Sequence, residues 1–214
     1  MKSTALSALN NNLLSVSNVT QFLVVNPAIS CKNPVVLAIV NRAAQRCRHW
    51  FGQEADVNFE RKFALLLTDY IASLPTLVAE FNSLCERNGW LNIAHQTNQI
   101  IVSFLQQNSE DQADIAVVNA LNIAYFSHRL IEELHDHMMC RLGKPETSWN
   151  MTGVNILAHQ AIGEAYAATL DQTVIELVDK LIINAPTLTE LENNKNQTFI
   201  WPCFCEQHGL SLAC

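Results

Sequence analysis

The chain has 214 residues, of which 49% are hydrophobic and 15% are charged, and its formal net charge at pH 7 is −7. This composition is typical of a folded globular protein and excludes an intrinsically disordered one. The acidic balance, with no basic stripe on any predicted helix, argues against a nucleic-acid partner, because a phosphate backbone would be repelled.

Residues 1–33 are expected to form an N-terminal arm or weak helix followed by a loop. Apolar residues recur only loosely from Leu6 to Val16. Three consecutive asparagines lie among them, so this segment lacks the continuous apolar stretch that a signal peptide needs. No apolar run approaches membrane-spanning length. The seven cysteines show no disulfide-like framework. We therefore expect a cytoplasmic protein with reduced thiols and no membrane partner.

Three helices are predicted in the first half of the chain from apolar residues that recur every three or four positions. The first begins at Pro34, a residue that suits the first turn of a helix, and runs to about residue 51. The second covers residues 57–87, and Pro75 inside it predicts either a kink or a division into two segments. The third covers residues 91–106.

Two long helices follow. Ser109 and Gln112 form a capping-box signature for the first, and Gly143 is expected to end it. Thr152 is the expected N-cap of the second, which should run without a break to about residue 184. Since no β-period alternation persists anywhere, residues 34–185 are predicted to form an all-α, antiparallel bundle of four to five core helices.

Residues 186–214 are predicted to be a C-terminal loop and a docking tail. The tail sequence FIWPCFC is apolar enough to pack onto the bundle or onto a partner chain. It also carries side chains with the right atoms for zinc, although a Cys-x-Cys spacing matches structural zinc sites poorly. These side chains are Cys203, Cys205, His208 and Cys214.

Three ionisable side chains lie on the apolar face of the helix before Gly143. His128, Glu132 and His135 are spaced at i, i+4 and i+7, so they project from one side of a helix. An unpaired buried carboxylate costs several kcal/mol, which makes this triplet more than packing alone usually tolerates. Residues predicted to share this face are Val117, Leu121, Ala124, Ile131, Met139 and Leu142. Residues predicted on the opposite, solvent face are Asn119, Asn122, Arg129, Glu133, Asp136 and His137.

A fourth histidine, His159, is placed on the inward face of the next long helix, which should be an antiparallel neighbour. A cluster of three histidines and Glu132 would suit Fe, Mn or Zn, because these ions accept imidazole nitrogen and carboxylate oxygen. Glu164 and Glu80 are candidates for additional carboxylate ligands. The core face of this helix is predicted to contain His159, Gly163, Tyr166, Leu170, Val174, Leu177 and Leu181.

The Glu132-x-x-His135 spacing resembles that of ferritin-like bundles, in which such pairs hold two metal ions. The resemblance covers one motif: the chain has no second Glu-x-x-His, and Glu80 and Glu164 lie at the borders of their apolar faces. His159 followed five residues later by Glu164 is similar to hemerythrin-like spacing, but the other ligand pairs of that family are missing. The resemblance implies a divalent metal in the bundle core.

Two hypotheses for the function remain open at this stage. In the first, the bundle binds a metal and acts as an oxidoreductase or a hydrolase. In the second, the triplet is a structural His/Glu hydrogen-bond network in a non-catalytic interaction or regulatory protein, expected to be a homodimer. Its dimer contacts would come from the N-terminal arm or the tail. Tyr166 is expected to be a core aromatic residue whose hydroxyl finds a partner, rather than a redox or acid residue.

Overall fold

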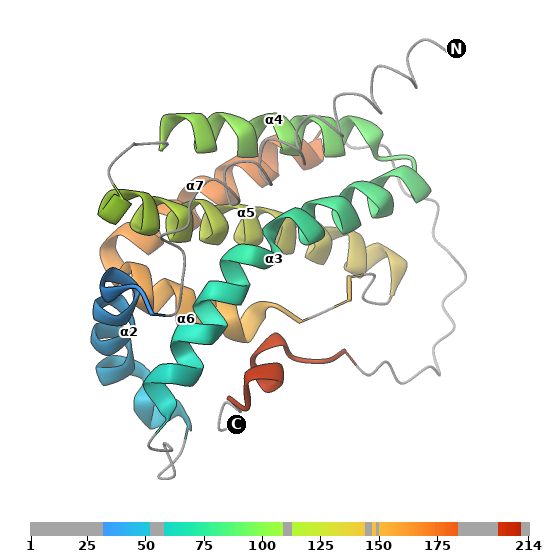
Figure 1. Ribbon diagram of the computed structural model, residues 1–214. Helices are drawn as coiled ribbons and strands as arrows, with labels where there is room; N and C mark the ends of the chain where they lie inside the picture. The colour runs from blue at the N-terminus through green and yellow to red at the C-terminus, as the bar shows by residue number, and fades with distance from the viewer. Residues whose placement is uncertain are drawn as a thin grey trace.

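The computed structural model describes residues 32–51, 58–108, 113–143, 147–148, 150–183 and 201–210. These residues contain six α-helices, two 3₁₀ helices and no β-strand, so the all-α prediction is confirmed for them (Figure 1). In chain order the elements are α2 (Pro34–Cys47), η1 (Arg48–Phe51), α3 (Phe59–Arg87), α4 (Leu91–Gln107), α5 (Ala113–Leu142), α6 (Thr152–Ile162), α7 (Glu164–Ile183) and η2 (Phe204–His208).

Helix α2 begins where the sequence predicts. The backbone N–H of Val35 donates to Oδ1 of Asn33 at 2.7 Å, so Asn33 caps the helix and Pro34 occupies the first turn. The α-helix ends at Cys47, and η1 continues the chain to Phe51. The predicted helix of residues 34–51 is therefore an α-helix followed by a 3₁₀ turn.

Pro75 lies inside α3 without dividing it. Proline has no N–H and crowds the preceding turn, so a helix that contains it bends. The ribbon changes direction near the middle of α3 (Figure 1). One turn before Pro75, the carbonyl oxygen of Tyr70 accepts a hydrogen bond from Ser73 Oγ at 2.8 Å and lies 3.1 Å from His128 Nε2 of α5. This part of α3 thereby fixes one of the candidate ligands.

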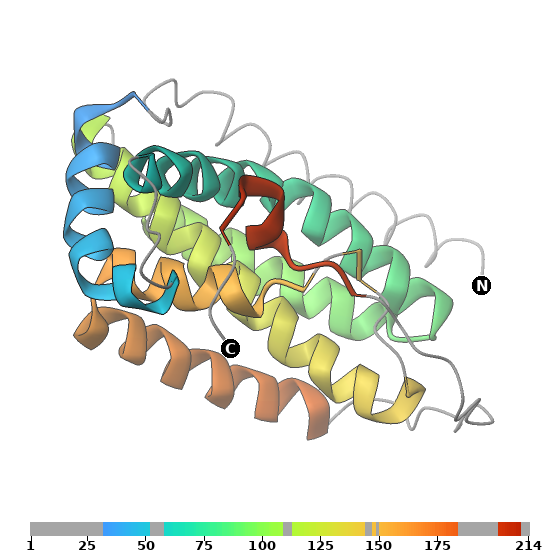
Figure 2. The same cartoon turned by 90° about the horizontal axis from the view of Figure 1, so that it is seen from below.

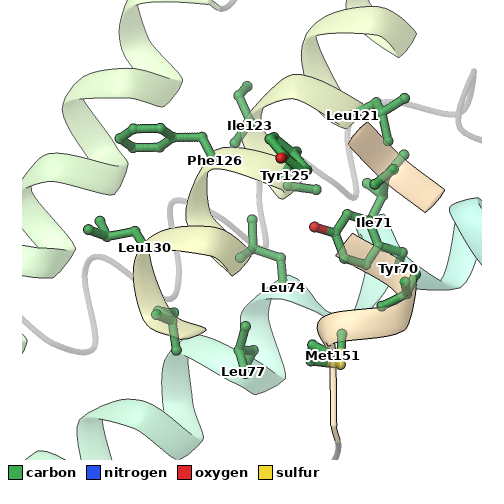
Figure 3. Packing of buried hydrophobic residues seen from close by; sticks show 14 of the residues in the cluster. Tyr70, Ile71, Leu74, Leu77, Leu121, Ile123, Tyr125, Phe126, Leu130 and Met151 are labelled. Atoms are coloured by element: carbon green, nitrogen blue, oxygen red, sulfur yellow. The ribbon is translucent and has the colours of Figure 1, made fainter. Parts of the chain in front are cut away.

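Helix α5 lies in the middle of the molecule and packs against α3, α4, α6 and α7 (Figures 1 and 2). Its contact with α3 is made by large apolar side chains, among them Leu74 and Leu77 of α3 and Leu130 of α5 (Figure 3). Complete burial of such a side chain stabilises a fold by about 1.5–3 kcal/mol. The helix that carries the candidate ligands is therefore held from several sides.

The prediction of one continuous helix from Thr152 to about residue 184 is wrong. Gly163 interrupts it with φ = 109° and ψ = 137°, a backbone conformation that residues with a side chain rarely adopt. The two helices on either side of Gly163 consequently present different faces to the core. Tyr166, predicted to be a core residue, is 44% exposed, whereas Ala167 is buried.

The sequence suggests Thr152 as the N-cap of α6. In the structure, Thr152 is instead the first residue of this helix. Met151 occupies the N-cap position, and the backbone N–H of Thr152 donates to Asn150 Oδ1 at 3.0 Å. The Thr152 hydroxyl is then free to contact α5, as described below. The predicted capping residues of α5, Ser109 and Gln112, lie outside the described residues, but Gly143 ends that helix with φ = 72°.

The described part of the tail, residues 201–210, packs back onto α3 and α6. Phe204, Cys205 and Leu210 are buried there. A parallel β-bridge joins Asn150 to Cys203 and supplies two backbone hydrogen bonds, of 2.9 and 3.1 Å. Of the two alternatives for the tail, packing onto the bundle is the one that this segment shows.

Within the described residues, α3 is the one helix that is long and apolar enough to cross a membrane on length and composition. Its most apolar window has a mean hydropathy of 1.3, and half of that window is buried inside the protein. The expectation that no apolar run approaches this length therefore fails for α3. A core helix of a folded protein can have the same length and hydropathy and is also buried in this way.

Candidate metal centre

Three of the six predicted ligands line one small cavity. His128, Glu132 and His135, all on α5, surround a space of about 20 Å³. A single water molecule needs about 10–15 Å³ of such space, so the cavity has room for one ion or one water. The other lining residues are Leu77, Ile131, Thr147, Met151 and Trp201.

The His128 ring is completely buried, and its surroundings determine its protonation. Its Nε2 lies 3.1 Å from the carbonyl oxygen of Tyr70, which can only accept, so Nε2 carries the hydrogen. Burial lowers the pKa of His128 to about 3, and the ring is neutral at physiological pH. Its Nδ1 therefore has a lone pair, and this atom has no hydrogen-bond partner within the described residues.

The Tyr70 ring also stacks on His128. The two ring centroids are 4.1 Å apart, with an interplanar angle of 22°. The Tyr70 hydroxyl donates to Oδ1 of Asn155 at 2.6 Å. Tyr70 thus holds the imidazole through its backbone and its ring, while its hydroxyl reaches α6.

Glu132 is held by residues of two helices. Its side chain is 11% exposed, and its carboxylate accepts hydrogen bonds from Thr152 Oγ1 and Asn155 Nδ2, each at 2.7 Å. Arg129, one turn earlier on α5, donates from Nη1 to Oε2 of the same carboxylate. The negative charge of Glu132 is therefore paired inside the protein.

His135 is 2% exposed and lies against the tail. Its ring centroid is 5.6 Å from that of Trp201, with an interplanar angle of 51°. Trp201 is in turn fixed by a hydrogen bond from its Nε1 to the carbonyl oxygen of Thr147 at 3.2 Å. The tail therefore forms part of the cavity wall, next to His135.

His159 does not reach this cavity but belongs to a second polar cluster between α5, α6 and α7. Its Nδ1 is 2.9 Å from the Tyr125 hydroxyl and 3.3 Å from Asp171 Oδ2. Its Nε2 is 3.2 Å from Oε2 of Glu164, a carboxylate that is 76% exposed. His159 and Glu164 thus pair with each other, apart from the other candidates.

Glu80, the sixth candidate, forms hydrogen bonds with the loop before α6. Its carboxylate accepts hydrogen bonds from the hydroxyl and the backbone N–H of Ser148, the second at 3.4 Å. The structure does not bring Glu80 to the cavity. Its present contacts hold the loop that carries Thr147 in the cavity wall.

Arg129 is the main residue that the sequence misplaces. It was assigned to the solvent face, yet its side chain is only 21% exposed, and it contacts Glu132, Glu133 at 3.5 Å and Asp171 at 3.2 Å. Asn122, assigned to the same face, is 7% exposed. The reason is that α5 is surrounded, so that α7 covers a face which a two-sided helical wheel leaves to solvent.

The contacts of Arg129 connect the two clusters into one network. The Tyr125 hydroxyl donates to both oxygens of Asp171, at 2.8 and 2.9 Å, and Asp171 accepts from Arg129 Nε. Burial, and then the Asp171 carboxylate, raise the pKa of Tyr125 far above its ordinary value. Its phenol therefore stays protonated and acts as a donor. From Arg129 the network continues through Glu132.

This network carries an excess of negative charge. One guanidinium faces the carboxylates of Glu132, Glu133 and Asp171. Although burial lowers the pKa of Arg129, the Glu132 and Asp171 carboxylates raise it beyond its ordinary value. Burial raises the pKa of Asp136 on the same helix, and the charges of Glu132 and Glu133 raise it further. The surroundings of the cavity favour an added cation.

As they stand, the side chains are not a preformed coordination sphere. Within the described part of the chain, no three His, Cys, Asp or Glu side chains are arranged as a metal-binding group. Of the predicted zinc ligands of the tail, His208 pairs elsewhere, with its Nε2 3.5 Å from Asp69 Oδ2 of α3, and Cys214 is outside the described residues. Binding at the cavity would require Glu132 to release one of its partners.

A larger groove, of about 440 Å³, opens between α4 and α7. Its floor contains Phe104 and Phe126, whose rings stack with centroids 4.1 Å apart. The rest of the lining is apolar or carries amides and hydroxyls, with no ionisable side chain. Among the described residues, its lining therefore offers no acid, base or metal ligand.

No protein-family model matches this chain, and neither a curated protein nor a solved structure matches it. The cavity and the charges around it are therefore the basis on which a function is proposed.

Proposed function

We propose that the protein binds one divalent transition metal ion, Fe, Mn or Zn, in the cavity lined by His128, Glu132 and His135. The observation that carries the proposal is the buried Nδ1 of His128. This atom is a neutral imidazole nitrogen with a lone pair and no hydrogen-bond partner among the described residues. Such a nitrogen is a metal ligand by its chemistry.

The hydrogen bond from His128 Nε2 to the Tyr70 carbonyl supports the proposal. Metal-binding histidines usually donate their other ring N–H to a carbonyl or a carboxylate, which fixes the tautomer and the ring orientation. Tyr70 gives His128 this arrangement and adds a stacked ring.

The charge distribution supports it as well. An incoming ion would take an oxygen of Glu132 that Arg129 now occupies, and Arg129 would keep its contacts with Asp171 and Glu133. The ion would then replace one positive neighbour of Glu132 with another. Because a single guanidinium faces three carboxylates, the added cation reduces an existing imbalance of charge.

Three protein ligands leave a coordination position for water. Sites with this number of protein ligands are typical of catalytic rather than structural metals, and the bound water can serve hydrolysis or be replaced by oxygen. We therefore place the protein among metal-dependent hydrolases or oxidoreductases. His159, Glu164 and Glu80 are left out of the first ligand set, because they pair elsewhere.

We keep two finer predictions with this function. The packing of α5 against four helices supports a bundle of four to five core helices with a ferritin-like arrangement. The five cysteines described by the structure, Cys47, Cys85, Cys140, Cys203 and Cys205, are free thiols, which supports a reducing, cytoplasmic location.

The test is elemental analysis of the full-length protein after reconstitution with Fe(II), Mn(II) or Zn(II) and desalting. We expect one ion per chain, and its loss in E132Q and H135N. The matched controls are E86Q, at an exposed glutamate of α3, and H137N, at an exposed histidine of α5; neither residue lines the cavity. Protein that retains none of the three metals, or equal losses in the control variants, would overturn the proposal.

A second candidate function needs no metal. The carboxylate of Glu132 already has Thr152, Asn155 and Arg129 as partners, which supports a purely structural His/Glu network in a helical interaction protein. Such a protein is expected to be a homodimer. Light scattering of the full-length chain measures its mass, and a monodisperse monomer contradicts this candidate.

A further inference from the structure

The cavity beside α5 is closed toward solvent by a residue of the C-terminal tail. Two of its lining histidines are almost completely buried: His128 is 0% exposed and His135 is 2% exposed. Besides Glu132, which is 11% exposed, the partly exposed lining residues are Thr147 and Trp201. These two residues lie outside the helices, so they form the wall that separates the buried histidines from solvent.

Trp201 is attached through its side chain, whereas the residues that follow it are attached through their backbone. Its Nε1 donates to the Thr147 carbonyl at 3.2 Å, at the long end of the ordinary range, and its ring centroid is 5.6 Å from that of His135. From Pro202 onward, the backbone is held by the β-bridge to Asn150, and η2 packs onto α3 and α6 (Figure 2). The indole can therefore turn away from His135 while the rest of the tail stays in place.

The volume of the cavity limits what it can hold while the indole is in place. The space is about 20 Å³, and a single water molecule needs about 10–15 Å³. An ion bound to His128, Glu132 and His135 would fill this space and leave no room for a water ligand beside it. A metal that hydrolyses a bond or activates oxygen needs such a second ligand. Part of the cavity wall must therefore move before this ligand can enter.

Trp201 is the part of the wall whose movement disturbs the fold least. The apolar lining residues on the helices belong to the buried core, so their displacement would open a close-packed interior. Thr147 is followed directly by Ser148, which donates two hydrogen bonds to the carboxylate of Glu80. By contrast, rotation of the Trp201 side chain breaks one hydrogen bond and one ring contact, and it leaves the core intact.

We propose that Trp201 is a gate, and that its indole controls the access of small solutes to the cavity by turning toward or away from His135. In the closed position, the indole shields His135 and the cavity holds one ion or one water. In the open position, a ligand of the size of water or dioxygen enters beside the ion, as in enzymes that open a lid over the reacting centre. The role of this ligand at a metal rests on the proposed function, whereas the shielding of His135 does not.

The gate is tested first on the full-length protein without added metal. Diethyl pyrocarbonate, a small reagent, acylates accessible neutral imidazoles, and peptide mass spectrometry with fragmentation measures the rate at each histidine. We expect His135 to react at least about tenfold more slowly than His137, which is exposed on the same helix. W201A should raise the rate at His135 at least about tenfold and leave that at His137 unchanged. W201F keeps an aromatic wall but lacks the donor to Thr147, so its rate should lie between the two.

W50A is the matched control, because Trp50 of η1 is also partly exposed but does not line the cavity. This variant should keep the wild-type rate at His135. Circular dichroism and thermal unfolding accompany every variant, so that a general loss of structure is recognised. Equal rates at His135 in wild type and W201A, or the same acceleration in W50A, overturn the gate. So does a wild-type protein in which His135 reacts as fast as His137, a result that needs no variant.

Uptake and release of Zn(II) by the same proteins separate the gate from the proposed function. Followed by stopped flow with a chromogenic chelator, both rates should be at least about tenfold higher in W201A than in wild type, with the affinity changed less than either rate. If no variant retains Zn(II) but Trp201 still controls the reaction of His135, the proposed function fails and the gate stands. If Zn(II) binds, but neither its uptake nor the reaction of His135 depends on Trp201, the gate fails and the metal site stands.

Discussion

Tyr70 and His128 are joined in two ways: His128 Nε2 lies 3.1 Å from the Tyr70 carbonyl oxygen, and the two rings stack with centroids 4.1 Å apart. The first contact fixes the tautomer of the imidazole, and the second fixes the plane of its ring. Both come from a residue of α3, so the chemical state of a histidine on α5 depends on a neighbouring helix. The remaining group of Tyr70, its hydroxyl, serves a different partner on α6.

Replacing Tyr70 by phenylalanine tests the role of that hydroxyl. The carbonyl and the stacked ring remain, but Oδ1 of Asn155 loses its donor inside the protein. A buried polar group without a partner costs about 1–3 kcal/mol, so we expect Y70F to lower the free energy of unfolding by this amount. Urea denaturation measures it. Y166F is the matched control, because Tyr166 is 44% exposed and its loss should change stability by less than about 0.5 kcal/mol.

The free energy of unfolding should decrease as the pH is lowered below 6.5, because of His128. Burial lowers the folded-state pKa of this residue from 6.5 to about 3. Below pH 6.5, His128 is therefore protonated in the unfolded chain but not in the folded protein. The free energy of unfolding then falls by up to about 1.4 kcal/mol per pH unit. Denaturation between pH 7 and 5, above the range of most carboxylates, measures this slope.

The matched variants for the pH experiment are H128N and H137N. His137 is exposed on the same helix, so H137N should keep the wild-type slope. H128N should be less stable at pH 7. Its free energy of unfolding should depend less steeply on pH, by the contribution of about one proton. A slope that is the same in all three proteins would show that His128 is not the group that titrates.

The sequence predicts much of this structure because periodicity reports burial on a helix. His128 and His135 sit among the apolar residues of α5, and both are almost completely buried. Likewise, Pro34 marks the start of α2 and Gly143 the end of α5. These are local properties, since a residue's face and its capping role depend on neighbours within a few positions.

What the sequence did not predict depends on partners that are distant along the chain. Arg129 is a core cation because Asp171, 42 residues later, is placed beside it by α7. Asn155 joins Glu132 to Tyr70 for the same kind of reason. His159 belongs to the second cluster because Asp171 of α7, beyond the break at Gly163, lies beside its Nδ1. A glycine within an apolar helical pattern was the one local signal of that break.

Gly163 should be the least replaceable glycine among those described. Apart from the adjacent residues of the chain, no atom of the described residues lies within 4 Å of the position that a Cβ would take, so G163A adds strain to the backbone without a steric clash. Its φ of 109° with ψ of 137° lies in a region almost restricted to glycine, where strain costs about 1–3 kcal/mol.

Gly89 offers the matched control for this substitution. It too has open space around it, but its φ of 74° is close to the left-handed helical region that alanine can enter for about 1–2 kcal/mol. We therefore expect G163A to destabilise the protein more than G89A does in thermal unfolding. Equal effects would mean that the backbone at Gly163 relaxes, and that the break between α6 and α7 does not depend on glycine.

Replacing Arg129 by methionine should have opposite effects on stability and on metal binding. The change leaves Glu132, Glu133 and Asp171 without their shared cation. Breaking a fully buried ion pair costs about 3–5 kcal/mol, and since the guanidinium is 21% exposed we expect a smaller loss, of about 2–3 kcal/mol. R61M, which removes an exposed arginine of α3, should be near neutral.

For the metal, Arg129 is a competitor, because it occupies the carboxylate oxygen that an ion at the cavity would take. Its removal leaves Glu132 with only the neutral donors Thr152 and Asn155, and it leaves more uncompensated negative charge around His128 and His135. We expect R129M to bind Zn(II) or Mn(II) at least about tenfold more tightly than wild type, a gain of about 1.4 kcal/mol, measured by competition with a chromogenic chelator. If R129M is destabilised but its metal affinity is unchanged or weaker, then the ion does not bind at Glu132. Arg129 would in that case serve the network between α5 and α7 alone.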